Sequence, residues 1–152
     1  MRVGDHVTRY VRRGSGLPVV IIGTDEEPHA VWAALAAALV DGVRVIAPEA
    51  PVAPGEFVTW LRGFVEGLGV SSAVVIVGGA WCAAAVELLT SEAGDFRALV
   101  FIPTRGTDEA ALRVAIESRP DSATLPTLWV QPDWPPAEAV RRILELIAAV
   151  SA

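Results

Sequence analysis

Apolar runs rich in β-branched residues alternate along this chain with segments whose apolar positions recur every three or four residues. Runs of the first kind are typical of buried strands, and the second spacing is typical of helices packed on one face. The runs predict strands at residues 6–12, 19–23, 43–48, 73–77, 98–102 and 127–130. The helical spacing predicts helices at residues 30–40, 57–68, 108–118 and 136–149, and a further helix after residue 79.

This alternation predicts one α/β domain. Strands separated by helices form a mostly parallel sheet with helices on both faces, joined by right-handed crossovers. The first strand, residues 6–12, precedes the turn Arg13-Gly-Ser-Gly-Leu-Pro18. We therefore expect this strand to form a hairpin with residues 19–23 and to be the one antiparallel strand, at the edge of the sheet. The expected fold is a three-layer α/β/α sandwich with a sheet of about six strands. The length of 152 residues fits a single domain.

Composition and charge narrow the setting. No apolar run approaches the ~20 residues of a membrane span, and the N-terminal MRVGDHVTRY is too charged for a signal peptide. The single cysteine, Cys82, excludes an internal disulfide and any multi-cysteine metal site, and it fits a reducing compartment. A net charge of −6 and a pI near 4.8 oppose binding to nucleic acid or anionic membrane. We expect a cytoplasmic protein that binds neither nucleic acid nor a membrane.

The segment VVIVGGAWCAAAVELL, residues 74–89, predicts a buried strand, a sharp turn and a helix. This is the outline of the nucleophile elbow, G-x-S-x-G, whose strained turn exposes a serine beside backbone N–H donors. Here Gly78 and Gly79 are followed by Ala80 in the place of the serine, and Cys82 stands in the place of the last glycine. The turn is therefore expected to have the shape of a hydrolase site without the nucleophile.

Four blocks of the sequence are similar, in order and spacing, to the α/β-hydrolase fold superfamily. They are RYVRRGSGLPVVIIG, WAALAAAL followed by RVIAPEAPVAPGEF, WLRGFVEGLGVSSAVVIVGGAW, and LPTLWVQPDWPP. The resemblance covers most of the chain and implies the sheet and crossover helices of that family. It also implies a catalytic triad in the chain order serine, acid, histidine.

Position by position, the resemblance shows what has been replaced. Ile22 and Gly23 stand where the family has the His-Gly that helps to form its oxyanion hole, and Glu49 stands where the family has an aspartate. Ala80 stands in the place of the serine, and Asp133, in QPDWPP, matches the family's acid.

Other family features have no counterpart. The only histidines, His6 and His29, precede the turn, and the chain stops before the family's last strand and histidine loop. Residues 104–127 leave no room for the lid that many members carry. We expect a truncated, lidless form from which no serine-histidine-acid triad can be assembled.

Three residues are candidates for chemistry, each with a structural alternative. Cys82 would lie in the first turn of the elbow helix, where the helix dipole lowers a thiol pKa, but a free cysteine is usually a small buried hydrophobe. His29 precedes an Ala-rich helix and would be a base, a ligand or a surface cap. Asp133 is either a vestigial acid or a turn residue before a helix that begins with proline.

A ligand site is expected at the carboxyl ends of the strands, where open α/β sheets bind small molecules. Trp81 and Trp134 would line it, and Trp32, Trp60 and Trp81 would cluster near the same edge unless they only fill the core. Backbone N–H groups of Trp81 and around Gly23 would donate hydrogen bonds to a carboxylate or enolate oxygen. The expected ligand-binding residues are Gly23, Thr24, Gly79, Ala80, Trp81, Asp133 and Trp134.

Three functional hypotheses follow, in decreasing order of support. The first is a non-hydrolytic protein that binds a small, partly apolar molecule or a protein partner. The second is a cofactor-free lyase, isomerase or cyclase that uses the remaining oxyanion-hole donors with Asp133, His29 or Glu49 as acid or base. The third is a hydrolase that depends on Cys82. No cofactor is expected, because the Gly-rich turn matches G-x-G-x-x-G only in degenerate form, and no metal is expected.

The last helix and the last strand motivate a homodimer hypothesis. Leu146 and its neighbours widen the apolar stripe of the last helix beyond what one surface requires. The strand at residues 127–130 is expected to be an unprotected edge. In the alternative interpretation, the helix and the Pro-rich flanks cover that edge.

Overall fold

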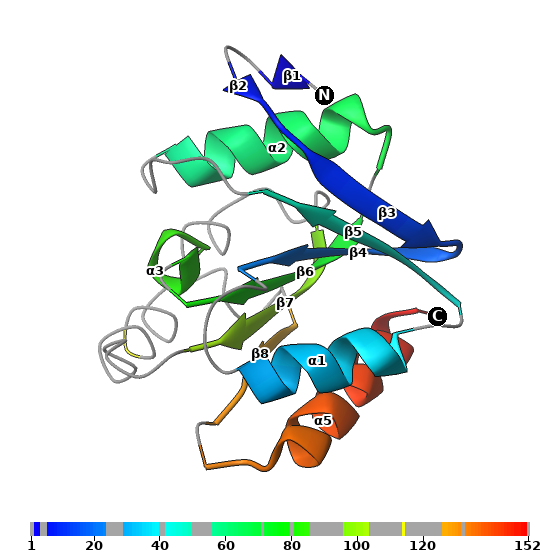
Figure 1. Cartoon of the computed structure of the whole chain (residues 1–152), viewed down its shortest axis with the longest axis vertical. Coiled ribbons are helices and arrows are strands. Elements are labelled where there is room, and N and C mark those ends of the chain that lie inside the picture. The colour runs from blue at the N-terminus through cyan, green and yellow to red at the C-terminus, as the bar shows by residue number, and fades with distance from the viewer. Residues whose placement is uncertain are drawn as a thin grey trace.

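A six-stranded sheet in the order β3-β5-β4-β6-β7-β8 forms the centre of the molecule (Figure 1). The structure is a computed structural model that describes residues 2–3, 6–23, 29–39, 42–49, 56–70, 72–79, 81–85, 96–103, 114, 126–131 and 133–151. The strands are β3 (Tyr10–Gly14), β4 (Leu17–Ile22), β5 (Val43–Pro48), β6 (Ala73–Gly78), β7 (Phe96–Ile102) and β8 (Thr127–Trp129). Only β3 runs antiparallel to its neighbour, and the other four pairs are parallel. This confirms the predicted fold class.

The predicted hairpin between the first two strands of the sheet is wrong, because β5 lies between β3 and β4. The turn that joins β3 to β4 instead wraps closely around the start of β5. Gly14 and Gly16 have φ values of +85° and +117°, and a Cβ atom on either would collide with the backbone at residues 42–43. The glycines of the turn therefore permit a close backbone approach and not a two-residue hairpin.

The N-terminal edge also differs from the single strand predicted at residues 6–12. It is divided into β2 (His6–Val7) and β3, with Thr8 and Arg9 between them. β2 pairs with β1 (Arg2–Val3) in a separate two-stranded sheet beside α2.

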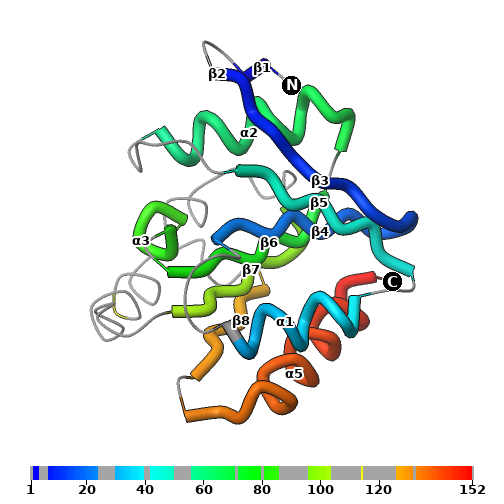
Figure 2. The backbone as a smooth tube through the Cα atoms, in the orientation of Figure 1, coloured from blue at the N-terminus to red at the C-terminus, as the bar shows by residue number. Residues whose placement is uncertain are grey.

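Helices cover both faces of the sheet. α1 (His29–Ala38) and α5 (Pro136–Val150) run side by side on one face, and α2 (Phe57–Gly67) and α3 (Trp81–Ala85) lie on the other (Figure 2). Strand side chains alternate between the faces, so β6 divides its residues between two cores. Val75 and Val77 pack with α2 and α3, whereas Val74 and Ile76 pack with α1 and α5. The three-layer arrangement is confirmed.

Most predicted element bounds agree with the structure to within two residues. The helix predicted at residues 108–118 lies outside the described residues except for residue 114. β8 is the outermost strand at its end of the sheet, as predicted, and pairs with β7 alone among the described strands. The homodimer remains a prediction. No helix in the described ranges is long and apolar enough to cross a membrane.

Candidate functional site

The candidate site lies where β4 and β6 end side by side. Gly23 follows β4 with φ +89°, and a Cβ atom there would lie 2.8 Å from the carbonyl oxygen of Gly78, the last residue of β6. The ends of β4 and β6 are thus in direct backbone contact. Only glycine fits at position 23, because the backbone conformation and the available space both exclude a side chain.

The predicted strand, turn and helix are present directly beyond this contact. Gly79 forms the turn with φ +59°. Its N–H donates to the carbonyl oxygen of Ile102 on β7 at 3.2 Å, and its carbonyl oxygen accepts from the N–H of Cys82 at 3.2 Å. α3 begins at Trp81. Because the N–H of Gly79 is already bonded to β7, it is not an available donor for a ligand oxygen.

Trp32 of α1 packs across the turn from the opposite face of the sheet. A Cβ atom on Gly78 would collide with Cζ2 of the Trp32 indole. The indole is 5% exposed, and its Nε1 has no hydrogen-bond partner within the part of the chain that the structure describes. Sequence reasoning missed this contact. The signal available was a glycine at the end of an otherwise β-branched run, where a side chain is absent because another one takes its space.

Cys82 lies in α3, on the buried side of the helix that faces the sheet. Its side chain has no exposed area, and Sγ donates to the carbonyl oxygen of Val77 at 3.7 Å. Burial raises the pKa of the thiol to about 12, and a backbone hydrogen bond with Ile102 lowers it only partly. Cys82 is therefore buried, as the structural alternative expected, and the helix dipole does not lower its pKa because desolvation of the thiolate outweighs the dipole. The thiol is protonated at neutral pH.

The tryptophans do not gather as expected. Trp81, partly exposed, stacks on Phe57 of α2 with ring centroids 5.6 Å apart, and Phe57 also contacts Trp60 at 6.1 Å. Trp32 packs in the core on the other face, so the predicted cluster of Trp32, Trp60 and Trp81 is wrong. Trp134 belongs to that other face too. The side chains of Trp81 and Trp134 therefore pack on opposite faces of the sheet, and a pocket lined by both stays a prediction.

The remaining candidates lie apart from the turn or outside the described residues. Asp133 is exposed in a turn in which the N–H of Trp134 donates to the carbonyl oxygen of Gln131 at 3.1 Å. Glu49 is exposed after β5, and its N–H donates to the carbonyl oxygen of Arg9. The structure describes neither the side chain of His29 nor Thr24 and Ala80. Roles for these residues stay predictions.

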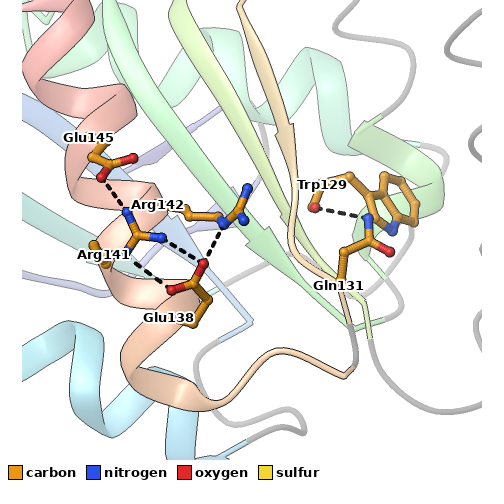
Figure 3. A network of polar contacts seen from close by, with 6 residues as sticks. All are labelled: Trp129, Gln131, Glu138, Arg141, Arg142 and Glu145. Carbon is orange, nitrogen blue, oxygen red and sulfur yellow. Dashed lines mark hydrogen bonds and ion pairs between the residues drawn. The ribbon is translucent and has the colours of Figure 1, made fainter.

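A polar network on α5 holds the loop after β8 in place. Glu138 accepts hydrogen bonds from Arg141 and Arg142 at 2.6 and 2.8 Å (Figure 3). The guanidinium of Arg142 lies 4.3 Å from the ring centroid of Trp134. Hydrogen bonds from the two arginines lower the pKa of the Glu138 carboxyl. These are pairs three and four residues apart on an exposed helix. They stabilise the exposed face of α5.

No metal centre is formed by the described residues, since no three or more His, Cys, Asp or Glu side chains among them could hold an ion together.

No family model matches the chain, and no curated protein matches it. Solved structures do match. An esterase from Thermogutta terrifontis aligns with TM-score 0.50 and 21% identity over 62% of this chain and 39% of its own. An epoxide hydrolase from Vigna radiata aligns with TM-score 0.54 and 19% identity over 75% of this chain and 44% of its own. An α/β-hydrolase enzyme from the metagenome of lagoon sediments at Mar Chica, Morocco, aligns with TM-score 0.54 and 19% identity over 89% of this chain and 79% of its own.

Proposed function

Starting from the α/β-hydrolase fold of this chain, we propose that it binds a small, partly apolar molecule at the carboxyl ends of β4 and β6 and does not hydrolyse it. The chain spans less than half the length of the esterase and the epoxide hydrolase that it resembles. Their activities are therefore not carried over to this chain. The proposal depends on the described turn and its surroundings.

The observation that carries the proposal is the chemistry of the elbow. Gly78 and Gly79 have no side chain, and alanine follows them in the sequence. The first nucleophilic side chain after the turn is Cys82, which is fully buried and has a thiol pKa of about 12. At pH 7 such a thiol is ionised in only about one molecule in 10⁵, and a thiol attacks as the thiolate. The elbow therefore lacks the group that attacks an ester.

The position of the proposed ligand follows from the strand order. Along the chain, β5 is added on one side of β4 and β6 is added on the other. The winding direction thus reverses between β4 and β6, and open α/β sheets bind ligands outside the carboxyl ends at such a switch point. Gly23 and Gly79 are the residues that directly follow these two strands.

Trp81 gives this site its apolar character. It is the first residue of α3 and lies directly after the turn, and Phe57 supports its indole from behind while the side chain remains partly exposed. An indole that is packed on one side and partly open on the other offers a flat apolar surface to a ligand. A small molecule with an apolar body and a carboxylate is the proposed ligand, because the N–H of Trp81 at the start of α3 would donate to an anionic oxygen beside the indole.

The test is a thermal-shift panel of butyrate, phenylacetate and malate. Malate is included because the Thermogutta terrifontis esterase was solved with malate bound. A ligand present at 100 times its dissociation constant stabilises the folded state by about 2.7 kcal/mol, which raises the melting temperature of a chain of this size by about 5–11 °C. We expect phenylacetate to give the largest shift.

Two variants that each remove one tryptophan locate the binding site. Trp81→Ala removes the proposed surface, and Trp134→Ala removes the same side chain from the opposite face of the sheet. Circular dichroism first establishes that both variants fold. We expect the shift to disappear in Trp81→Ala and to persist in Trp134→Ala. Equal shifts in the two variants, or no shift with any probe at millimolar concentration, would overturn the proposed site.

A further inference from the structure

The antiparallel edge strand β3 has an unusual surface for so acidic a chain. Among the described strands it pairs only with β5, and all five of its residues are exposed. Arg12 and Arg13 lie on the strand and Arg9 lies just before it, all exposed, whereas the whole chain carries a net charge of −6. Val11, between these arginines, is 69% exposed. Among the residues that the structure describes, none of these three arginines forms an ion pair with an acidic side chain.

The register shows which backbone groups of β3 point away from the sheet. The N–H of Glu49 donates to the carbonyl oxygen of Arg9 at 2.8 Å, so the peptide groups of Arg9 face β5. Residues of an antiparallel strand alternate in this respect, so the N–H and C=O groups of Tyr10 and Arg12 face outward. The pairing of Tyr10 with Pro48 agrees, because proline has no N–H to donate.

Contacts on both faces hold this strand in place. The Tyr10 ring packs edge-on against Phe64 of α2 with centroids 5.5 Å apart. Arg13 reaches the other face, where its Nη2 lies 3.5 Å from the carbonyl oxygen of Ala36 on α1. The outer edge is therefore a fixed template of outward donors and acceptors, of the kind to which a further strand adds.

We propose that the outer edge of β3 binds an extended acidic segment of a partner protein by strand addition. The backbone groups of Tyr10 and Arg12 supply the ladder, Val11 supplies an apolar contact, and the arginines select glutamate or aspartate side chains. A second copy of this chain is disfavoured, because pairing β3 with β3 would place arginines opposite arginines. The inference goes beyond the proposed function and does not depend on it.

The experiment measures fluorescence anisotropy of labelled ten-residue peptides titrated with the full chain. One peptide alternates glutamate with valine, and its matched control alternates lysine with valine. We expect the glutamate peptide to bind and the lysine peptide not to bind. Binding should weaken as salt rises from about 0.01 M to about 1 M, because the screening length falls from about 30 Å to about 3 Å. Equal binding of both peptides, or no binding of the glutamate peptide, would overturn the proposal.

Two substitutions at one position separate charge from backbone. Arg12→Gln removes the charge and keeps the outward N–H, whereas Arg12→Pro removes both and leaves the ladder with β5 intact, as proline does on edge strands. We expect Arg12→Gln to weaken binding up to about fivefold, and Arg12→Pro to weaken it at least about threefold more. Equal affinities of the two variants would refute strand addition. A dimer seen by light scattering and lost in Arg12→Pro would assign the edge to a second copy instead.

Discussion

Gly23→Ala tests the backbone contact on which the geometry of the site depends. At position 23 the added methyl group meets two separate obstacles. The φ of +89° is unfavourable for any residue with a Cβ atom, and the new Cβ would lie 2.8 Å from the carbonyl oxygen and 3.2 Å from the carbonyl carbon of Gly78. Both are backbone atoms of a central strand, so they cannot move aside as a flexible side chain would.

The expected magnitude is the sum of two terms. Placing alanine at positive φ costs about 1–2 kcal/mol, and forcing one methyl group into a well-packed region costs about 1–3 kcal/mol more. Gly69→Ala is the matched control, because Gly69 has φ +70° and no atom of the residues that the structure describes lies within 4 Å of the place that its methyl group would take. We therefore expect a loss of about 2–5 kcal/mol for Gly23→Ala and about 1–2 kcal/mol for Gly69→Ala.

Urea unfolding, followed by tryptophan fluorescence and far-UV circular dichroism, measures both variants. Coincident transitions by the two probes are required before free energies are compared. The reasoning is refuted if Gly23→Ala is destabilised no more than Gly69→Ala, since the close approach of the ends of β4 and β6 would then carry no steric cost.

Three further predictions concern buried and exposed polar groups. Burial raises the folded-state pKa of Cys82 from 9.0 to about 12, so the stability that the protonated thiol contributes is complete below pH 9 and lost toward pH 12. In urea unfolding, wild type should therefore lose about 1.4 kcal/mol per pH unit in that window relative to Cys82→Ala. Parallel pH profiles of the two proteins would contradict this. Trp60→Phe removes the buried hydrogen bond from Nε1 to Oγ1 of Thr8, 2.9 Å long, and should lower the free energy of unfolding by about 1–3 kcal/mol. Trp32→Phe deletes an N–H that has no partner among the described residues, so it should lower that free energy less in the same assay. The reverse order would be inconsistent with the structure. Nuclear magnetic resonance titration should give Glu138 a midpoint below that of an ordinary glutamate, as its pKa is lowered by two arginines of α5; a midpoint unchanged after both arginines are replaced by glutamine would refute that cause.

The layers of the fold could be predicted because burial leaves a periodic record in the sequence. β6 is buried along its whole length, so its residues are all apolar or glycine and no alternation appears. α5 shows the opposite pattern, with Val140, Ile143 and Ile147 buried and both arginines exposed. Each pattern follows from local position relative to the core.

Strand pairing could not be predicted in the same way. The turn at Gly14–Gly16 has the composition of a hairpin, yet glycine there serves to pass close to β5. Composition records that a turn needs positive φ and little space, and it does not record which strand provides the neighbouring backbone.

The candidate site shows the same division. The strand-turn-helix at Gly78 to Trp81 was predicted, because the sequence outline of an elbow is local. The burial of Cys82 was one of two predicted alternatives, because a free cysteine is usually a small buried hydrophobe. The direction of its pKa shift was not predicted, because it depends on how α3 packs against the sheet. The separation of Trp81 from Trp134 likewise depends on which face of the sheet each side chain packs against.

Hydrolysis of p-nitrophenyl acetate and p-nitrophenyl butyrate by the purified chain tests the central claim most directly. Wild type is compared with Cys82→Ala and Asp133→Ala under identical conditions. The account predicts no turnover above buffer in any of the three proteins, because the elbow presents no nucleophile. Turnover by the wild type that is lost in either variant would contradict the account and would identify the group that acts in place of the serine.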